Sequence, residues 1–216
     1  MNVSVVLPSF NRARLLPITI PTYFQEDVSE VILVDDCSSD NTAEVVKELQ
    51  TRFPTLRYFR NEVNSKQPYT QNVAISKVQS EYIYFGDDDS VLYPGSIRNL
   101  LNVMREKNAD IVGGRALALF FPEQIDELDE FLSHYRNRIA TEANQIVDLS
   151  TLSTNFTYTV KEPIRVPFCH ASCLCKTQVA REMQFDVKIE GNAYREETDF
   201  LIRATLAGYT IYYTSS

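Results

Sequence analysis

The sequence lacks a hydrophobic run long enough to cross a membrane. Its best candidate, residues 111–121, is interrupted by Gly113, Gly114 and Arg115, whereas a spanning helix needs about 20 mostly apolar residues. Residues 2–20 also lack the basic start and the long apolar stretch of a secretory signal peptide. We therefore expect a cytoplasmic chain without a transmembrane segment, and peripheral contact with the inner face of the membrane stays open.

Basic residues are also scarce. The chain has 21 Lys and Arg against 29 Asp and Glu, which gives a formal net charge of -8. This balance argues against a nucleic-acid partner and against broad attraction to anionic lipid. An acidic protein can still bind a nucleotide where a metal and local donors screen the phosphates.

The sequence has only four cysteines, and three of them lie within residues 169–175. A zinc site needs a fourth ligand at normal spacing, which is missing here. Reduced and mostly buried thiols are therefore favoured over a metal site, and they suit a cytosolic protein.

Strand and helix patterns alternate along the first half of the chain. Continuous apolar runs predict strands at residues 3–7 (ended by Pro8), 31–34, 56–59 and 82–85, and helices are predicted at 14–25, 42–53, 68–77 and from 94 onward. Strands that are apolar throughout are typical of a parallel sheet covered on both faces. A last helix around residues 200–204 and a strand at 210–213 complete an α/β fold.

The middle of the chain is harder to interpret. Residues 122–140 predict an acidic amphipathic helix with an apolar stripe of Ile125, Leu128, Leu132, Tyr135 and Ile139. Packing of that stripe on the domain is favoured over a partner or membrane face. Residues 141–165 predict a loop or irregular strands.

Three consecutive acids, Asp87, Asp88 and Asp89, directly follow the predicted strand at 82–85 and Gly86. Ligands of open α/β sheets bind at the carboxyl ends of the strands. Adjacent carboxylates repel one another unless a cation or hydrogen-bond donors offset them, and their oxygens suit Mg²⁺ or Mn²⁺. The alternative is a polar turn of solvated acids.

Two other polar segments, residues 9–12 and Asp35-Asp36, also follow predicted strands, so all three segments are expected to converge. No Gly-rich phosphate loop follows the first strand, and a metal held by carboxylates is the natural substitute. A further acidic cluster, residues 196–199, contains Glu197, which is a candidate general base. Acids at a helix start also occur for reasons of the helix dipole alone.

Four segments together resemble the successive motifs of glycosyltransferase family 2, the inverting enzymes of GT-A fold. They are Val-Ser-Val-Val-Leu-Pro-Ser-Phe-Asn-Arg, Ile-Leu-Val-Asp-Asp-Cys-Ser-Ser-Asp-Asn-Thr, Tyr-Phe-Gly-Asp-Asp-Asp-Ser-Val-Leu-Tyr-Pro and Tyr-Arg-Glu-Glu-Thr-Asp-Phe-Leu-Ile-Arg. The resemblance implies one GT-A domain over residues 1–216, with a mostly parallel, Rossmann-like sheet flanked by helices. Residues 1–110 would bind the nucleotide-sugar and residues 111–216 the acceptor.

The resemblance also implies roles for single residues. The loop that packs on the base and ribose would consist of Pro8, Ser9, Asn11 and Arg12. Asp36 would accept a hydrogen bond from the base, which makes a UDP-sugar the first expectation and a GDP-sugar the second. The alternative role for Asp36 is to cap the turn at Thr42, for which Asp40 and Asn41 are also candidates.

The acids Asp87 and Asp89 match the Asp-x-Asp motif, with Asp88 in the variable middle position beside the nucleotide. Asp87 would lie near the ribose, and Asp89 together with Asp87 would hold Mn²⁺ or Mg²⁺. Glu197 matches the general base, and Arg203 matches a basic residue that follows it. The implied reaction transfers a sugar, with inversion, to a glycan, lipid-linked or other hydroxyl acceptor.

The chain departs from the family pattern at several points. Glu197 stands where Asp is usual, and Gln71 where Arg often precedes Asn72. The sequence ends at Ser216, before a segment in which relatives place a histidine near the metal, so no such histidine is expected here and the acceptor half is expected to be reduced or truncated. The rival interpretations are a degenerate transferase that binds without turnover and a nucleotidyltransferase, which usually has a Gly-rich basic loop.

Overall fold

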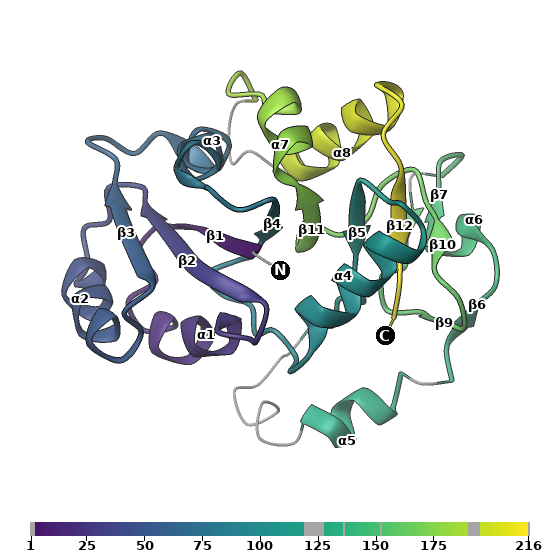
Figure 1. Cartoon of the computed structure of the whole chain (residues 1–216), viewed down its shortest axis with the longest axis horizontal. Coiled ribbons are helices and arrows are strands. Elements are labelled where there is room, and N and C mark those ends of the chain that lie inside the picture. Colours follow the sequence, from purple (N-terminus) through teal and green to yellow (C-terminus); the bar gives the residue numbers. More distant parts are fainter. Residues whose placement is uncertain (1–2, 119–127, 136, 152, 190–194, 216) are drawn as a thin grey trace.

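A computed structural model describes residues 3–118, 128–135, 137–151, 153–189 and 195–215. Its centre is one sheet of eight strands: β1 (Val3–Ser9), β2 (Val28–Asp35), β3 (Leu56–Arg60), β4 (Tyr82–Phe85), β5 (Ile111–Gly113), β10 (Ile164–Arg165), β11 (Cys173–Lys176) and β12 (Ile211–Tyr213). The spatial order is β10-β12-β5-β11-β4-β1-β2-β3, and helices pack around this sheet (Figure 1).

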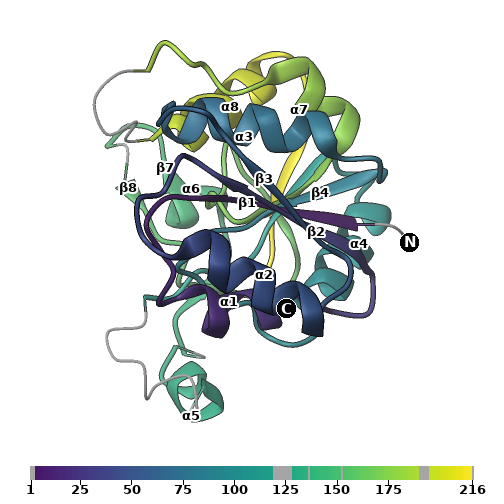
Figure 2. The same cartoon turned by 90° about the vertical axis from the view of Figure 1, so that its left-hand side faces the viewer.

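Helices cover both faces of the sheet (Figure 2). One face carries α1 (Leu16–Tyr23), α2 (Thr42–Arg52) and α4 (Ser96–Glu106), and the other carries α3 (Lys66–Lys77), α7 (Thr177–Met183) and α8 (Glu196–Leu206). Successive residues of β1 point to opposite faces, as a strand requires: Val6 belongs to the core that contains Phe200, and Leu7 to the core that contains Leu16. The expected α/β sheet with two covered faces is confirmed.

The first four strands are parallel, as predicted, but β1 does not end at Pro8. It continues to Ser9, with Pro8 in register with Val34. Proline has no N–H to donate to a neighbouring strand. This is tolerated because the pairing of β1 with β4 ends at Val6, opposite Phe85, so Pro8 faces no strand on that side.

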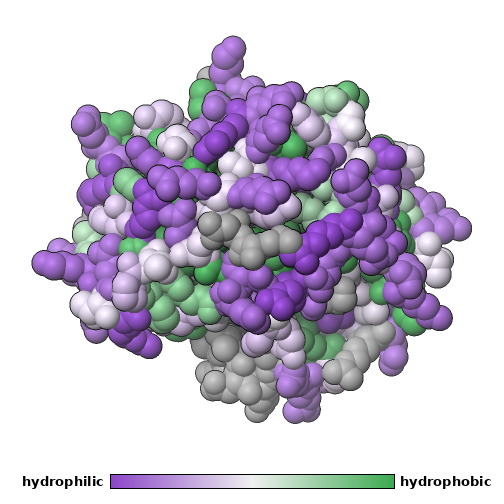
Figure 3. All heavy atoms as spheres, viewed as in Figure 1, coloured by the Kyte–Doolittle hydropathy of each residue, from purple (hydrophilic) through white to green (hydrophobic). Residues whose placement is uncertain are grey.

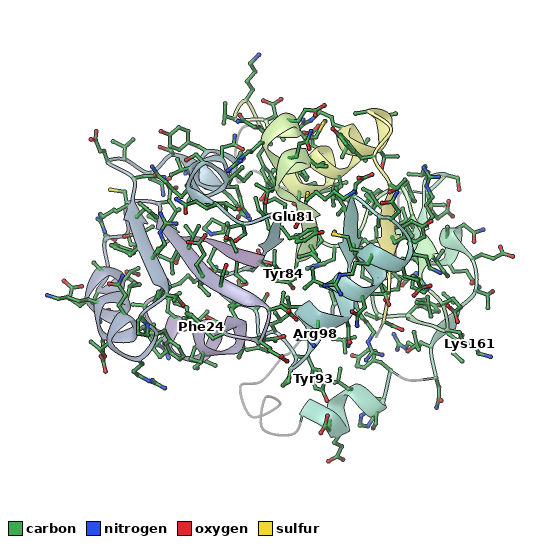
Figure 4. All side chains as sticks on the ribbon, in the orientation of Figure 1. Phe24, Glu81, Tyr84, Tyr93, Arg98 and Lys161 are labelled. Carbon is green, nitrogen blue, oxygen red and sulfur yellow. The ribbon has the colours of Figure 1, made fainter. Side chains whose placement is uncertain are left out.

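The strands β5 and β11 were not predicted. β11 lies antiparallel between β4 and β5, and β5 in turn pairs with the parallel strand β12. Tyr84, labelled near the middle of Figure 4, is flanked by Val5 on one side and Leu174 on the other. Strands of three or four residues are too short to show a reliable period in the sequence.

Of the long helix predicted at 122–140, the described part is helical only in α5 (Leu128–Ser133), and the prediction is wrong after it. The helix α5 ends in a turn, and β6 (Ile139–Ala140) then pairs in parallel with β9 (Thr159–Val160). Ile125 lies outside the described residues, and Ile139 is exposed rather than on a buried stripe. The expected irregular region holds α6 (Ala143–Ile146) and the strand pair β7 (Val147–Asp148) and β8 (Ser153–Thr154).

Polar residues cover much of the face seen in Figure 3, with smaller apolar areas between them. Among the described helices, none has both the length and the apolar character needed to cross a bilayer.

Gly113 in β5 packs directly against Cys169. A Cβ at this position would lie 2.4 Å from Cβ and 2.7 Å from Sγ of Cys169, whereas a Cβ at Gly114 would meet only Leu100 Cδ2, at 3.8 Å. Because overpacking strains a core, Gly113→Ala should lower the free energy of unfolding by about 1–3 kcal/mol, and Gly114→Ala should change it by less than about 0.5 kcal/mol. Urea unfolding of both variants measures this, and equal midpoints would contradict the close approach.

Candidate functional site

The loops after β1, β2 and β4 meet at one edge of the sheet. They start side by side because β1 lies between β2 and β4 and all three strands are parallel. A pocket at this edge is lined by Pro8, Ser9, Phe10, Arg12, Asp36, Gln67, Thr70 and Asp88. The expected convergence of the three polar segments is therefore confirmed, and α3 contributes the remaining wall.

The acids after β4 do not form a solvated turn. The Asp87 carboxylate accepts a hydrogen bond from Ser172 Oγ at 2.9 Å. The backbone carbonyls of Asp87 and Asp88 accept bonds from Tyr23 Oη at 2.8 Å and Thr19 Oγ1 at 3.1 Å, both on α1. Burial raises the pKa of Asp87, and it raises the pKa of Asp88 to about 6.

Arg12 is the cation that faces these acids. Its Nε lies 3.5 Å from Asp88 Oδ1, and its Nη2 lies 3.6 Å from Asp89 Oδ2. The Asp89 side chain is half exposed, so it is the acid of this group that remains open to a ligand.

The loop after β1 is shaped by Asn11. It has a φ of 54°, a left-handed conformation that Asn tolerates better than most residues, and its Oδ1 accepts the Ser39 N–H at 2.7 Å. The following turn is capped by Asp40, whose Oδ1 accepts from both the N–H and the hydroxyl of Thr42. The alternative role for Asp36 as the cap at Thr42 is therefore wrong.

Asp36 instead joins the end of β2 to the start of α3. Its Oδ1 accepts from Asn61 Nδ2 and from the Ser65 N–H, and its Oδ2 accepts from the Lys66 N–H, all at 2.8 Å. A carboxylate can accept about four hydrogen bonds. These contacts fill three of the acceptor positions of Asp36, which also lines the pocket.

The start of α8 lies at the same corner as the loop after β4. Glu197 is partly buried, and its negative charge acts on Asp87. The preceding residue, Glu196, is only 5 % exposed, and burial, with the adjacent Glu197 carboxylate, raises the pKa of Glu196 to about 7.

Arg203 does not face the pocket. Its guanidinium contacts Asp199 at 2.8 Å and the backbone carbonyls of Met183 and Gln184 at 2.7 Å each. It therefore fastens α8 to the end of α7, a structural role that its motif position did not reveal.

Two residues of this corner, His170 and Ser172, were not predicted. They precede β11, and the charges of Asp87 and Glu197 both act on the His170 ring. No spacing in the sequence could have placed them, because the placement depends on β11 pairing with β4. The prediction of mostly buried thiols in this segment is confirmed for Cys169, Cys173 and Cys175.

The acids at this corner fit a divalent cation that is shared with a ligand. Asp87 and Asp89 supply hard oxygen donors of the kind that Mg²⁺ and Mn²⁺ prefer. Within the described parts of the chain, no three His, Cys, Asp or Glu side chains form a closed metal site. Such a cation would therefore complete its shell with water and phosphate oxygens, as Mg²⁺ commonly does.

Comparison with known proteins now decides the family. The model of glycosyl transferase family 2 matches residues 4–173. The chain belongs to this family. The solved structures with this fold include Staphylococcus aureus TarS 1-349 in complex with UDP-GlcNAc. The two structures superpose with a TM-score of 0.67 at 17% identity, and the match covers 100% of this chain and 59% of the TarS chain. The expected GT-A fold is thereby confirmed.

Two curated relatives show how far the family match extends. A Campylobacter jejuni GalNAc(5)-diNAcBac-PP-undecaprenol beta-1,3-glucosyltransferase is 33% identical over 51% of this chain and 37% of its own length. The poly(ribitol-phosphate) beta-N-acetylglucosaminyltransferase TarP of Staphylococcus aureus is 32% identical over 52% of this chain and 36% of its own length. The match thus spans little more than a third of each relative.

The raised pKa of Glu196 should make the stability of the folded protein depend on pH. The folded protein raises the pKa of Glu196 from 4.5 to about 7, so it binds more protons than the unfolded chain between these values. Folding is therefore favoured at low pH, and this stability is lost as the pH rises through about 7. Relative to Glu196→Gln, the wild type should lose on the order of 1–3 kcal/mol of unfolding free energy between pH 5 and pH 8.

The measurement is urea unfolding at several pH values, with the exposed Glu44→Gln as the control for loss of a surface carboxylate. The unfolding free energy of Glu44→Gln should change with pH as that of the wild type does. If the unfolding free energy of Glu196→Gln also followed the wild type across this pH range, Glu196 would keep an ordinary pKa in the folded protein.

Proposed function

We propose that this chain transfers a sugar from a nucleoside diphosphate sugar to an acceptor hydroxyl, with inversion. The observation that carries the proposal is the meeting of Asp36, Arg12, the acids 87–89 and Glu197 at one edge of the sheet. Residues 1–110 bind the nucleotide-sugar, and residues 111–216 approach the acceptor.

The pocket at the ends of β1 and β2 holds the nucleoside. Pro8, Ser9 and Arg12 line it on one side and Asp36 on another, while Asn11 holds the loop in shape. The Asp36 carboxylate meets a ring N–H of the base. Uracil offers such a donor, as does guanine, so a UDP-sugar is the first assignment and a GDP-sugar the second. Solved structures of the same fold include TarS with UDP and a Pyrobaculum calidifontis mannosyltransferase with GDP-Man and Mn²⁺. The mannosyltransferase superposes with a TM-score of 0.64 at 17% identity, and the match covers 99% of this chain and 54% of the mannosyltransferase chain.

Asp89, with Asp87, would hold Mn²⁺ or Mg²⁺ at the diphosphate. Bound there, the cation would neutralise negative charge that grows on the leaving diphosphate. Arg12 already faces Asp88 and Asp89, and its exposed guanidinium is within reach of the same phosphates. Burial of Asp87 and Asp88 strengthens these interactions because water screens them less.

Glu197 takes the proton from the acceptor hydroxyl as that oxygen attacks the anomeric carbon. One displacement from the side opposite the diphosphate inverts the configuration. Binding donor and acceptor in one cleft supplies the proximity that such a reaction needs. The acceptor class, a glycan or a lipid-linked or other hydroxyl compound, is supported by relatives whose names specify PP-undecaprenol and poly(ribitol-phosphate).

The metal assignment is tested by binding. Asp89→Ala should weaken Mn²⁺-dependent binding of UDP by at least about tenfold, the lower end of the loss on disturbing a metal site. The control, Glu44→Ala, removes one exposed carboxylate that does not line the pocket and should bind as the wild type does. Isothermal titration with and without Mn²⁺ measures both, and an Asp89→Ala protein with wild-type affinity and metal dependence would refute the assignment.

The base assignment is tested by turnover. Glu197→Gln keeps the shape and removes the basicity, so it should lower kcat by roughly 10²-fold or more and leave donor affinity nearly unchanged. Glu196→Gln, one residue earlier, is the matched control and should lower kcat far less. Release of free UDP in the presence of an acceptor is the readout. A large loss of kcat in Glu196→Gln and a small one in Glu197→Gln would assign the role of base to Glu196 instead.

A further inference from the structure

The segment that precedes β11 is carried to the candidate site by strand pairing. β11 is antiparallel to β4, with Leu174 opposite Tyr84 and Cys175 opposite Ile83. Residues just before β11 therefore continue alongside residues just after β4. The 2.9 Å hydrogen bond from Ser172 to Asp87 shows this directly, and His170 lies two residues further along.

The His170 ring is held in one orientation and one tautomer. The backbone N–H of Ser172 donates to His170 Nδ1 at 3.1 Å, and the Phe156 ring meets the imidazole edge to face, with centroids 5.9 Å apart at 80°. A nitrogen that accepts a hydrogen bond carries no proton, so the proton of the neutral ring is on Nε2. Burial lowers the pKa of His170 and favours this neutral form.

This arrangement argues against His170 as a metal ligand. A histidine that binds a metal through one ring nitrogen almost always donates a hydrogen bond from the other. Here the other nitrogen, Nδ1, faces an N–H donor and must accept. Ligation through Nε2 would move the proton to Nδ1 and place two donors against each other.

The Nε2–H group is the remaining donor of the His170 ring. Within the described ranges of the chain, His170 makes no hydrogen bond other than that of Nδ1. The acids whose charges act on the ring are Asp87 and Glu197, which also act on each other. Because Ser172, two residues later, binds Asp87 at 2.9 Å, His170 lies on the segment that borders this corner.

We propose that His170 binds the sugar that is transferred, by donating a hydrogen bond from Nε2–H to one of its oxygen atoms. The inference rests on the proposed function, in which Asp87 lies on the nucleotide side and Glu197 on the side of the attacking hydroxyl. The transferred sugar must lie between those two sides. Its hydroxyl oxygens, or an N-acetyl carbonyl, are the acceptors that a neutral imidazole N–H can meet.

The binding test separates the sugar from the nucleotide. Affinities for UDP and for a panel of UDP-glucose, UDP-galactose and UDP-N-acetylglucosamine are measured with Mg²⁺ for the wild type, for His170→Phe and for the control His134→Phe, which changes the chain's other histidine. His170→Phe keeps an aromatic ring against Phe156. It should weaken the best UDP-sugar roughly tenfold, the effect of one lost hydrogen bond, and leave UDP affinity unchanged.

Equal losses for UDP and UDP-sugar, or no loss for either, would overturn the role of His170. A wild type that binds the UDP-sugars no better than a non-nucleotide would instead overturn the proposed function and this inference with it. His134→Phe should bind both ligands as the wild type does.

A second measurement does not depend on any variant at the site. The ¹⁵N shifts of the two histidines, assigned with His134→Phe, report which ring nitrogen carries the proton. We expect His170 to be protonated on Nε2 before and after addition of Mg²⁺ and UDP, and the Nε2–H signal to move only when the UDP-sugar is added. A proton on Nδ1 after addition of Mg²⁺ and UDP would overturn the proposal in favour of a metal ligand.

Discussion

Burial of Asp87 and Asp88 behind β4 is the constraint on which the rest of the site depends. Carboxylates removed from water stay charged only where donors or cations compensate them. Here Ser172, 85 residues from Asp87 in the sequence, donates to one acid, and Arg12 faces the other. Tyr23 on α1 holds the backbone between them. Compensation of these two carboxylates therefore depends on contacts from three distant parts of the chain, and the pocket lies where those parts meet.

Two adjacent acids in the first turn of α8 lie in different environments. Glu196 is buried with a raised pKa, whereas Glu197 is partly open to the corner that it shares with Asp87. Arg203 holds the same helix against the end of α7. The orientation of this turn is therefore set by packing, and a substitution at either acid has to be examined for its effect on folding as well as on binding.

The N-terminal half could be predicted because its signals are local. Apolar runs that end in Asp36 or Asp87 identify both a buried strand and the polar residues at its carboxyl end. The missed parts depend on tertiary partners. β5 and β11 are strands because they pair with each other, and because β11 also pairs with β4 and β5 with β12. Ile139 is extended because it pairs with Thr159. His170 was missed for the same reason. Asp36 and Asp40 show a further limit, since composition could not tell which acid caps the turn at Thr42.

The insertion of β11 between β4 and β5 also determines the order in which the fold can be completed during synthesis. β1 to β4 can pair with one another as soon as they leave the ribosome, but β4 then has one edge without a partner, and unpaired edges invite association with other chains. Among the described residues before β11, none pairs with that edge of β4. The edge therefore stays open until residues 173–176 have been synthesised.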